Sequence, residues 1–319
     1  MASPSRTELH ALVTAATRAP SSHNTQPWLF RFSSDGIELS ADRARGLPVN
    51  DPLDRELTIS CGAALFNLRA AAARANWHVD VALRPEGSDD ADVLARVRLG
   101  HGTGEAPLAR LAEAIDTRYS TRDAFDASEV DLEIERELIS AAAQEGAELW
   151  LIKGDARAPI ASLVCEGDRR QFSDPRWRRE LASWMHSRRS GDGLATAPIV
   201  APVSRLVVRH FDLGQRVGDK DRSLVLEAPV LAVLSTKGDT VEDWLVAGQA
   251  LERVLLVAAG HGLQAGYVNQ PCQVEELRGR LAEVATPGHR PQLLFRLGRP
   301  SERRTPSARR PISDVLEDA

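Results

Sequence analysis

Apolar residues recur along the chain with two spacings, one typical of helices and one typical of strands. Near the N-terminus the helical spacing runs over 6–18, and Ser5 with Glu8 three residues later forms a capping box that marks its start. The same patterns predict helices at 52–74, 107–116, 130–143, 158–166, 174–188, 241–260 and 274–284, and strands at 28–32, 37–40, 77–83, 93–99, 149–153, 229–235, 264–269 and 292–297.

Two of these helices, 52–74 and 241–260, are long and rich in small and apolar residues. Asp51 as N-cap and Pro52 at the first helical position predict where the first one begins. Gly62 lies in its middle, where a residue without a side chain lets another helix approach closely. The apolar surroundings predict a central, buried helix rather than a surface one.

Both long helices belong to an internal repeat. Aligned without gaps, 61–85 and 247–271 match at several small and apolar positions, and Gly62 falls on Gly248. Each copy is a long helix followed by a strand, and the same order occurring twice indicates a duplication. The chain is therefore predicted to consist of two related halves, 1–116 and 117–319, with an insertion at about 167–224 that the first half lacks.

Composition narrows the class of protein. The chain has 319 residues, of which 43% are hydrophobic and 27% charged, and no apolar run reaches the roughly 18 residues that cross a bilayer. With no secretory leader pattern at the start, we expect a cytoplasmic protein with no membrane association. A net charge of −5 offers no electrostatic case for nucleic acid, and three widely spaced cysteines argue against a disulfide framework or a cysteine zinc site.

The string PSSHNTQPW at 20–28 separates the first helix from the first strand. The helical pattern stops before Pro20, and Pro27 directs the chain into an extended conformation. Between the two prolines nearly every residue offers a polar side chain or a free backbone N–H, which suits a polar, planar ligand. An ordinary hydrophilic turn explains Ser21, Ser22 or Asn24 taken singly.

Two basic motifs occur in the second half, RYSTR at 118–122 and ARRP at 308–311. A guanidinium matches phosphate oxygens bidentately, so Arg118 and either Arg309 or Arg310 are candidate phosphate ligands. The alternative, above all for the tail, is an arginine-rich solvated surface. Glycine-rich stretches lack the context of a dinucleotide fingerprint, and GxSxG, P-loop and HExxH motifs are absent, so hydrolase, NTPase and zinc protease functions have no support in the sequence.

Taken together, PSSHNTQPW, RYSTR and ARRP resemble the motifs of the nitroreductase family, and most closely those of its Acg-type branch of fused, single-chain proteins. The resemblance covers about 7–316. It implies an α+β fold in which the two tandem halves form a pseudo-dimer within one monomer, around central buried helices; further association of chains stays open. It also implies FMN as cofactor, NAD(P)H as electron donor and a small-molecule substrate. Only one complete set of motifs is present, which implies one FMN per chain.

The resemblance also assigns contacts to residues. Arg122 is expected near the N1/C2 carbonyl edge of the flavin, where a cation stabilises the reduced form. His23 could touch flavin or substrate, although a loop histidine is more often solvated. The backbone around 267–270 is expected beside flavin N5. No catalytic side chain and no metal ligand are expected, because the flavin carries the chemistry. The expected cofactor contacts are Ser21, Ser22, Asn24, Gln26, Arg118, Tyr119, Ser120, Arg122, Val268, Asn269, Arg309 and Arg310.

Two functions fit these features. One is an FMN-dependent NAD(P)H oxidoreductase that passes hydride to flavin N5 and then to a nitroaromatic, quinone or similar acceptor. The other is a protein that holds FMN under a lid with little or no turnover. The insertion would supply the lid, since Trp177, Trp184 and Met185 fall at spacings that would present one apolar helix face, and Asp192 with Gly193 would provide a hinge.

Overall fold

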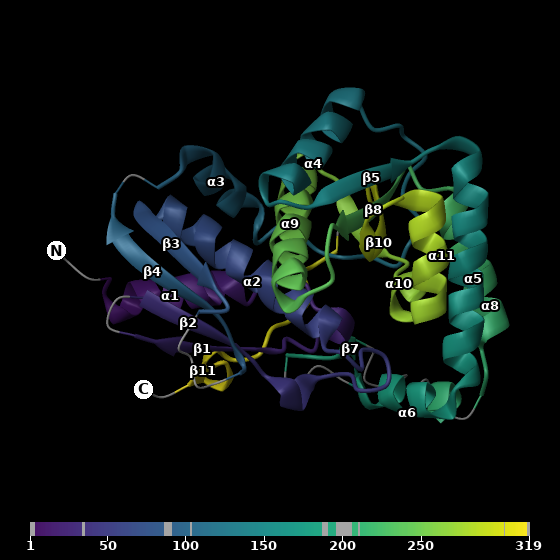
Figure 1. Cartoon of the computed structure of the whole chain (residues 1–319), viewed down its shortest axis with the longest axis horizontal. Helices are drawn as coiled ribbons and strands as arrows, with labels where there is room; N and C mark the ends of the chain where they lie inside the picture. Colours follow the sequence, from purple (N-terminus) through teal and green to yellow (C-terminus); the bar gives the residue numbers. More distant parts are fainter. Residues whose placement is uncertain are drawn as a thin grey trace.

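The computed structural model describes residues 4–33, 36–85, 91–102, 104–186, 191–195, 206–209, 211–302 and 304–317. Two mainly antiparallel sheets lie on either side of a pair of long helices (Figure 1), so the predicted α+β class is confirmed. Within the described ranges, no helix is both long enough and apolar enough to cross a membrane.

The first half of the chain forms a sheet with the order β11-β1-β2-β4-β3. The last strand of the chain, β11 (Leu316–Glu317), pairs parallel with β1 and so ties the C-terminus to this half. The predicted capping box is confirmed, because Ser5 and Glu8 bond reciprocally. The elements are α1 (Arg6–Ala16), β1 (Trp28–Phe32), β2 (Gly36–Ala41), α2 (Arg55–Arg74), β3 (Trp77–Leu83), β4 (Val93–His101) and α3 (Ala106–Leu111).

The second half forms a sheet with the order β5-β8-β10-β9. The helices and strands of this half are α4 (Leu132–Gln144), β5 (Glu148–Ile152), α5 (Arg157–Ser173), α6 (Pro175–Ser183), β6 (Met185–His186), β7 (Leu194–Ala195), α8 (Gly214–Leu226), β8 (Val230–Thr236), α9 (Val241–Gly260), β9 (Gln264–Tyr267), α10 (Gln270–Gln273), α11 (Glu275–Ala285) and β10 (Arg290–Gly298).

The two sheets are built in the same way. In each half two strands are followed by a long helix and then by two more strands, and the fourth strand lies between the second and the third. Thus β1, β2, α2, β3 and β4 correspond in order to β5, β8, α9, β9 and β10. This shared topology agrees with the duplication inferred from the sequence repeat.

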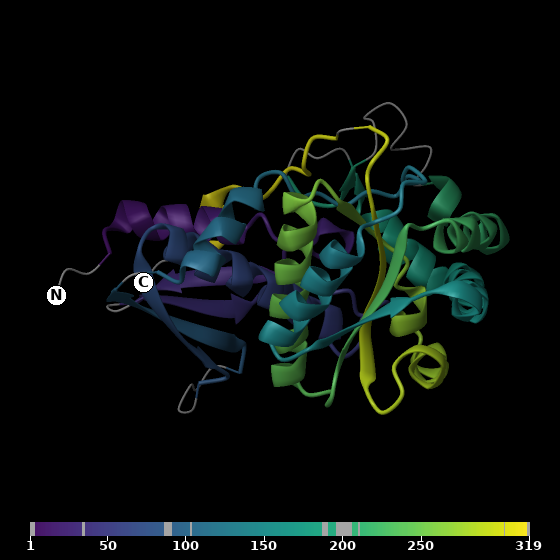
Figure 2. The ribbon, with the colours of Figure 1, turned by 90° about the horizontal axis from the view of Figure 1, so that it is seen from above.

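The two long helices α2 and α9 cross with their backbones in contact, at the centre of the molecule (Figure 2). A Cβ atom on Gly62 would lie 2.4 Å from the Leu245 carbonyl oxygen, and one on Gly248 would lie 2.1 Å from that of Ile59. Both distances are far below van der Waals contact, so this crossing requires glycine on each helix. The predicted packing of these two buried helices is confirmed.

The start of α2 differs from the prediction. The helix begins at Arg55, and its N-cap is Asp54 in the left-handed conformation (φ 55°) rather than Asp51. Asp51 nevertheless satisfies the helix terminus, because its Oδ2 accepts from the backbone N–H of Leu57 at 2.9 Å. Residues around Pro52 form a turn before the helix. Asp51, whose side chain accepts this bond, therefore lies about one turn upstream of the N-cap position.

The connection between β5 and β8 spans 153–229, whereas β2 begins only a few residues after β1 ends. Within it, α5 and α8 pack side by side at the edge of the molecule far from the first sheet (Figure 1). The predicted helix 158–166 continues to 173, and the predicted helix 174–188 ends at Ser183. Residues 187–190, 196–205 and 210 of the insertion lie outside the described residues.

The single apolar helix face expected in the insertion does not form. Trp177 is buried on α6 and its indole packs edge-on against Phe172, with ring centroids 4.9 Å apart. Trp184 is the C-cap residue of α6, and Met185 has already entered β6. The helix ends before the second tryptophan, so the three side chains lie on different elements.

Candidate functional site

A cavity of about 640 Å³ is enclosed by residues of both halves. The PSSHNTQPW loop, the RYSTR motif, the long helices α2 and α9, the insertion and the C-terminal tail all contribute to its wall. Of the residues predicted to contact a cofactor, those that line it are Ser21, Ser22, Asn24, Arg118, Tyr119, Ser120, Arg122, Asn269 and Arg309. Gln26, Val268 and Arg310 lie outside its lining.

The PSSHNTQPW loop is held in an unusual backbone conformation. His23, Asn24 and Gln26 have positive φ angles of 51°, 56° and 52°. Each such angle costs a non-glycine residue about 1–2 kcal/mol, so the surrounding structure must hold the loop in place. Part of that support is local, because Ser21 Oγ accepts from the backbone N–H of Gln26 at 3.0 Å. Ser22 Oγ donates to Glu56 Oε2 at 2.5 Å and so fixes the loop to α2.

The three predicted residues outside the cavity have structural partners. The buried Gln26 side chain donates from Nε2 to the Gly191 carbonyl at 2.9 Å and accepts at Oε1 from the Arg310 backbone N–H at 2.9 Å. Gln26 therefore joins the loop to both the insertion and the tail. Arg310 also donates from Nη1 to the Gln26 carbonyl at 3.0 Å. The backbone N–H of Val268 donates to the Leu294 carbonyl at 3.1 Å, which removes it as a cofactor donor.

Arg118 and Arg309, which are far apart in the sequence, meet at one carbonyl oxygen. The Nη2 atoms of both donate to the Arg18 carbonyl at the end of α1, each at 2.8 Å. Arg118 is 4% exposed, and its Nε lies 3.3 Å from Oε1 of the fully buried Glu252. The solvated arginine surface considered as an alternative therefore does not describe these two residues. They form a positioned pair of guanidinium groups in the cavity wall.

Arg122 differs from that pair, because it forms no hydrogen bond or ion pair with any described residue. Its side chain is exposed and lines the cavity, where desolvation by the surrounding wall lowers the pKa of the guanidinium and the charge of Asp221 acts in the opposite direction. His23 lies in the same wall. Burial, followed by the charge of Arg122, lowers the His23 pKa to about 3, so the imidazole is neutral. His23 is thus partly buried in the cavity lining rather than a fully solvated loop histidine.

Glu56, in the first turn of α2, is a cavity residue that the sequence did not reveal. Its carboxylate accepts from Ser22 in the loop, from Asn269 after β9, and from Gln273 Nε2 at 3.0 Å. It thereby links the loop of the first half to the strand end of the second. An acidic residue in a first turn is ordinarily explained by the helix dipole, and nothing in the sequence distinguishes this one. Asp168, Asp221 and Arg296 also line the cavity without having been predicted.

The insertion supplies an apolar part of the wall through Phe172, Trp177, Leu181 and Leu194. The carbonyls of Gly191 and Gly193 lie within 3.5 Å and 3.4 Å of Asn24 Nδ2, which donates to them. The segment carrying the expected hinge is thus bonded directly to the PSSHNTQPW loop.

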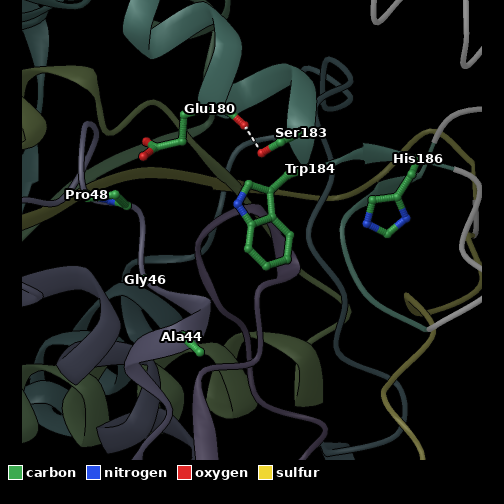
Figure 3. Close-up of a pocket in the computed structure, with 7 residues that line it drawn as sticks. All are labelled: Ala44, Gly46, Pro48, Glu180, Ser183, Trp184 and His186. Atoms are coloured by element: carbon green, nitrogen blue, oxygen red, sulfur yellow. Dashed lines mark hydrogen bonds between the residues drawn. The ribbon is translucent and has the colours of Figure 1, made fainter.

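Trp184 lies elsewhere, in a separate surface pocket of about 390 Å³ (Figure 3). The Arg45 guanidinium lies 5.2 Å from the centre of the Trp184 ring and forms an ion pair with Asp192. In the same pocket Ser183 Oγ donates to the Glu180 carbonyl at 2.6 Å, which closes the end of α6. At this pocket, which lies outside the main cavity, Arg45 of the first half contacts Trp184 and Asp192 of the insertion.

Comparison with known proteins places the chain in a family. No family model matches it. It is 30% identical to "Putative NAD(P)H nitroreductase Rv3131" of Mycobacterium tuberculosis, in an alignment that covers 98% of this chain and 92% of that protein. The chain belongs to the nitroreductase family. A second relative is "Putative NAD(P)H nitroreductase acg" of the same organism. The two proteins are 28% identical in an alignment that covers 97% of this chain and 95% of that protein.

The predicted resemblance to the nitroreductase family and its Acg-type members is therefore confirmed. Among solved structures, a nitroreductase-like family protein from Bacillus cereus aligns with 66% of this chain and 95% of its own, at 17% identity and a TM-score of 0.41.

Proposed function

We propose that this nitroreductase-family chain is an FMN-dependent NAD(P)H oxidoreductase that reduces a nitroaromatic, a quinone or a similar acceptor. The observation that carries the proposal is the meeting of the PSSHNTQPW loop with Arg118, Arg122 and Arg309 around one cavity. The names of the curated relatives, NAD(P)H nitroreductases, support the electron donor and the reaction class.

The cavity suits FMN in size and in chemistry. Its volume of about 640 Å³ falls within the roughly 300–1,000 Å³ of ligand pockets. Arg118 and Arg309 would hold the phosphate, since two guanidinium groups side by side match its oxygens. Arg122, which has no protein partner among the described residues, would face the flavin edge that gains negative charge on reduction. When bound, FMN supplies hydride transfer, and the chain binds and orients it.

We further propose that one FMN binds per chain, across the two halves 1–116 and 117–319, and that the monomer already contains the interface between them. The split of the motifs supports this, because the loop belongs to the first half and the arginines to the second. Titration of the purified chain with FMN tests the stoichiometry. A chain that takes up no FMN, or two per chain, refutes the proposal.

The position of the insertion favours a second candidate function, a protein that holds FMN under a lid. Phe172, Trp177 and Leu194 line the cavity, and the carbonyl of Gly191 accepts from Gln26 in the loop. A nicotinamide could then stack on the flavin only after the insertion moved, and reduction would be slow.

Anaerobic mixing of the FMN-loaded chain with NADPH and NADH, following the oxidised flavin band, separates the two functions. Reduction of the flavin as fast as catalytic turnover requires supports the oxidoreductase. Reduction that takes many minutes supports the protein that holds FMN under a lid. The Arg45→Ala variant removes the ion pair with Asp192 and the bond to the Thr25 carbonyl, and neither Arg45 nor Thr25 belongs to the cavity lining. Arg43→Ala is the matched control, since Arg43 lies in the same turn and pairs with Asp54 and Asp92 of the first half. Faster reduction in Arg45→Ala alone indicates a lid, and equal rates indicate an open cavity.

A further inference from the structure

Two carboxylates of the insertion face the cavity from neighbouring helices. Asp168 lies on α5 and Asp221 on α8, and both belong to the cavity lining. They share a single amide group, because Gln270 Nε2 donates to Asp168 Oδ1 at 3.0 Å and to Asp221 Oδ2 at 2.8 Å. Gln270 is the first residue of α10, which begins shortly after β9, and Tyr267 at the end of β9 also lines the cavity.

Glycines allow these three side chains to come together. A Cβ atom on Gly214 of α8 would lie 2.9 Å from the Arg169 Cα, and one on Gly218 would lie 3.0 Å from Cys165 Sγ, both on α5. On α5, a Cβ on Gly167 would lie 2.7 Å from that of Gln270. Two helices and α10 thus approach at backbone distance, which fixes the spacing of the two carboxylates and the amide.

The pair has fewer hydrogen-bond donors than two ionised carboxylates require. Asp168 is 2% exposed, and its buried Oδ2 has no hydrogen-bond partner. Neither carboxylate forms an ion pair with a described residue. Asp221 is partly buried. Two like charges in such surroundings that share one neutral donor repel each other, and the usual resolution is that one of them keeps a proton.

The surrounding charges indicate which carboxyl keeps it. Burial raises the Asp221 pKa, and the bond from Gln270 opposes this effect. Three nearby cations oppose it as well, namely Arg122 at the end of the RYSTR motif, Arg296 on β10 and Lys220 on α8. Among the described residues, no cation lowers the pKa of Asp168 in this way. Burial first, and then the charge of Asp221, raise the Asp168 pKa to about 7, while the bond from Gln270 acts the other way. Asp168 is therefore the proton-bearing member.

We propose that Asp168, paired with Asp221 through Gln270, is a proton donor to acceptors reduced in this cavity. The proposal rests on the proposed oxidoreductase function. Reduction of a quinone to a hydroquinone adds one hydride, supplied by the reduced cofactor, and one proton, so that each oxygen ends as a hydroxyl. The O–H bond of Asp168 breaks, its proton passes to an acceptor oxygen, and the resulting carboxylate regains a proton from water.

Thermal unfolding of the purified chain tests whether Asp168 holds the proton, independently of activity. An unfolded aspartate has a pKa of about 3.9. Between pH 4 and 7 the unfolded chain therefore binds fewer protons than the folded one, and the contribution of Asp168 to stability falls as pH rises. Asp168→Asn lacks this proton, so its Tm relative to wild type should rise over that window and then level off. A Tm difference that is constant from pH 4 to 8 overturns the proposal.

The oxidation of the reduced, FMN-loaded chain by a quinone tests delivery of the proton. In wild type the rate should fall above about pH 7, as Asp168 loses its proton. Asp168→Asn should be about 100-fold slower at pH 6, the lower end of general-acid effects, and nearly independent of pH. Asp221→Asn removes the like charge beside Asp168, so the fall in rate should begin at lower pH. Ferricyanide, which accepts electrons without protons, should oxidise all variants at the wild-type rate.

Asp219→Asn is the matched control, because Asp219 is exposed on α8 two residues before Asp221 and bonds only locally with Gln215. It should match wild type with both oxidants. Equal loss of rate with quinone and ferricyanide in Asp168→Asn would indicate a structural role and overturn proton donation, as would an unchanged quinone profile. Failure of wild type to bind FMN would instead refute the proposed function, and proton donation with it, whatever the unfolding experiment shows.

Discussion

The crossing of α2 and α9 can be broken with a single methyl group. In Gly248→Ala the new Cβ would lie 2.1 Å from the Ile59 carbonyl oxygen and 2.8 Å from the Ala63 backbone nitrogen. Both atoms belong to the backbone of α2, so no side chain can rotate away, and the helices must separate by about 1 Å. Overpacking costs up to about 3 kcal/mol, occasionally more, and the gain in helix propensity returns about 1 kcal/mol. Because both clashing atoms belong to the backbone, we place the cost at the upper end of that range and expect a net loss of about 2 kcal/mol.

Urea unfolding followed by circular dichroism measures this loss, with Gly279→Ala as control. Gly279 lies within α11, is exposed, and has no atom within 4 Å of its ideal Cβ position. The control should gain up to about 1 kcal/mol from helix propensity alone. Because Ile59 and Leu251 of the two helices line the main cavity, Gly248→Ala should also weaken FMN binding. A Gly248→Ala chain as stable as wild type would refute the argument that glycine is required at this crossing.

Two further changes test the charged groups. Arg118→Ala alone leaves Glu252 buried without its cation, so the variant to use is Arg118→Ala with Glu252→Gln. In this double variant the affinity for FMN should fall by about one to two decades, while the affinity for riboflavin stays nearly unchanged. An equal loss for both ligands would place Arg118 away from the phosphate. Burial opposes ionisation of Asp239, but hydrogen bonds, those from Arg278 foremost, hold its pKa well below the usual range. Asp239→Asn should therefore cost about 2 kcal/mol at pH 7, less than a fully buried pair because Asp239 is partly exposed. That cost should shrink as pH falls below about 4, where wild type loses the same contribution, and a cost independent of pH would contradict the assignment.

Local sequence patterns were sufficient for most helices and strands. The strand at 28–32 and the helix at 241–260 lie where apolar periodicity places them, because the period along an element depends only on residues within it. The contact between the two long helices could also be predicted from the sequence, because glycines at matched positions of a repeat leave room for a second backbone. Element ends were less predictable. The helix after β5 continues through Gly167 because α10 packs against that glycine, which is a tertiary contact.

For the site, the sequence determined which motifs would take part, and only the tertiary structure decided what each residue does there. Gln26 was indistinguishable from its loop neighbours until its amide was found between the insertion and the tail. Arg118 and Arg309 meet at the carbonyl of Arg18, across nearly the whole length of the chain. Asp168 carries no signal in the sequence, because its environment comes from helices and strands distant along the chain. Hydrophobic period is a short-range property, whereas burial, charge and shared hydrogen bonds arise only when distant segments pack together.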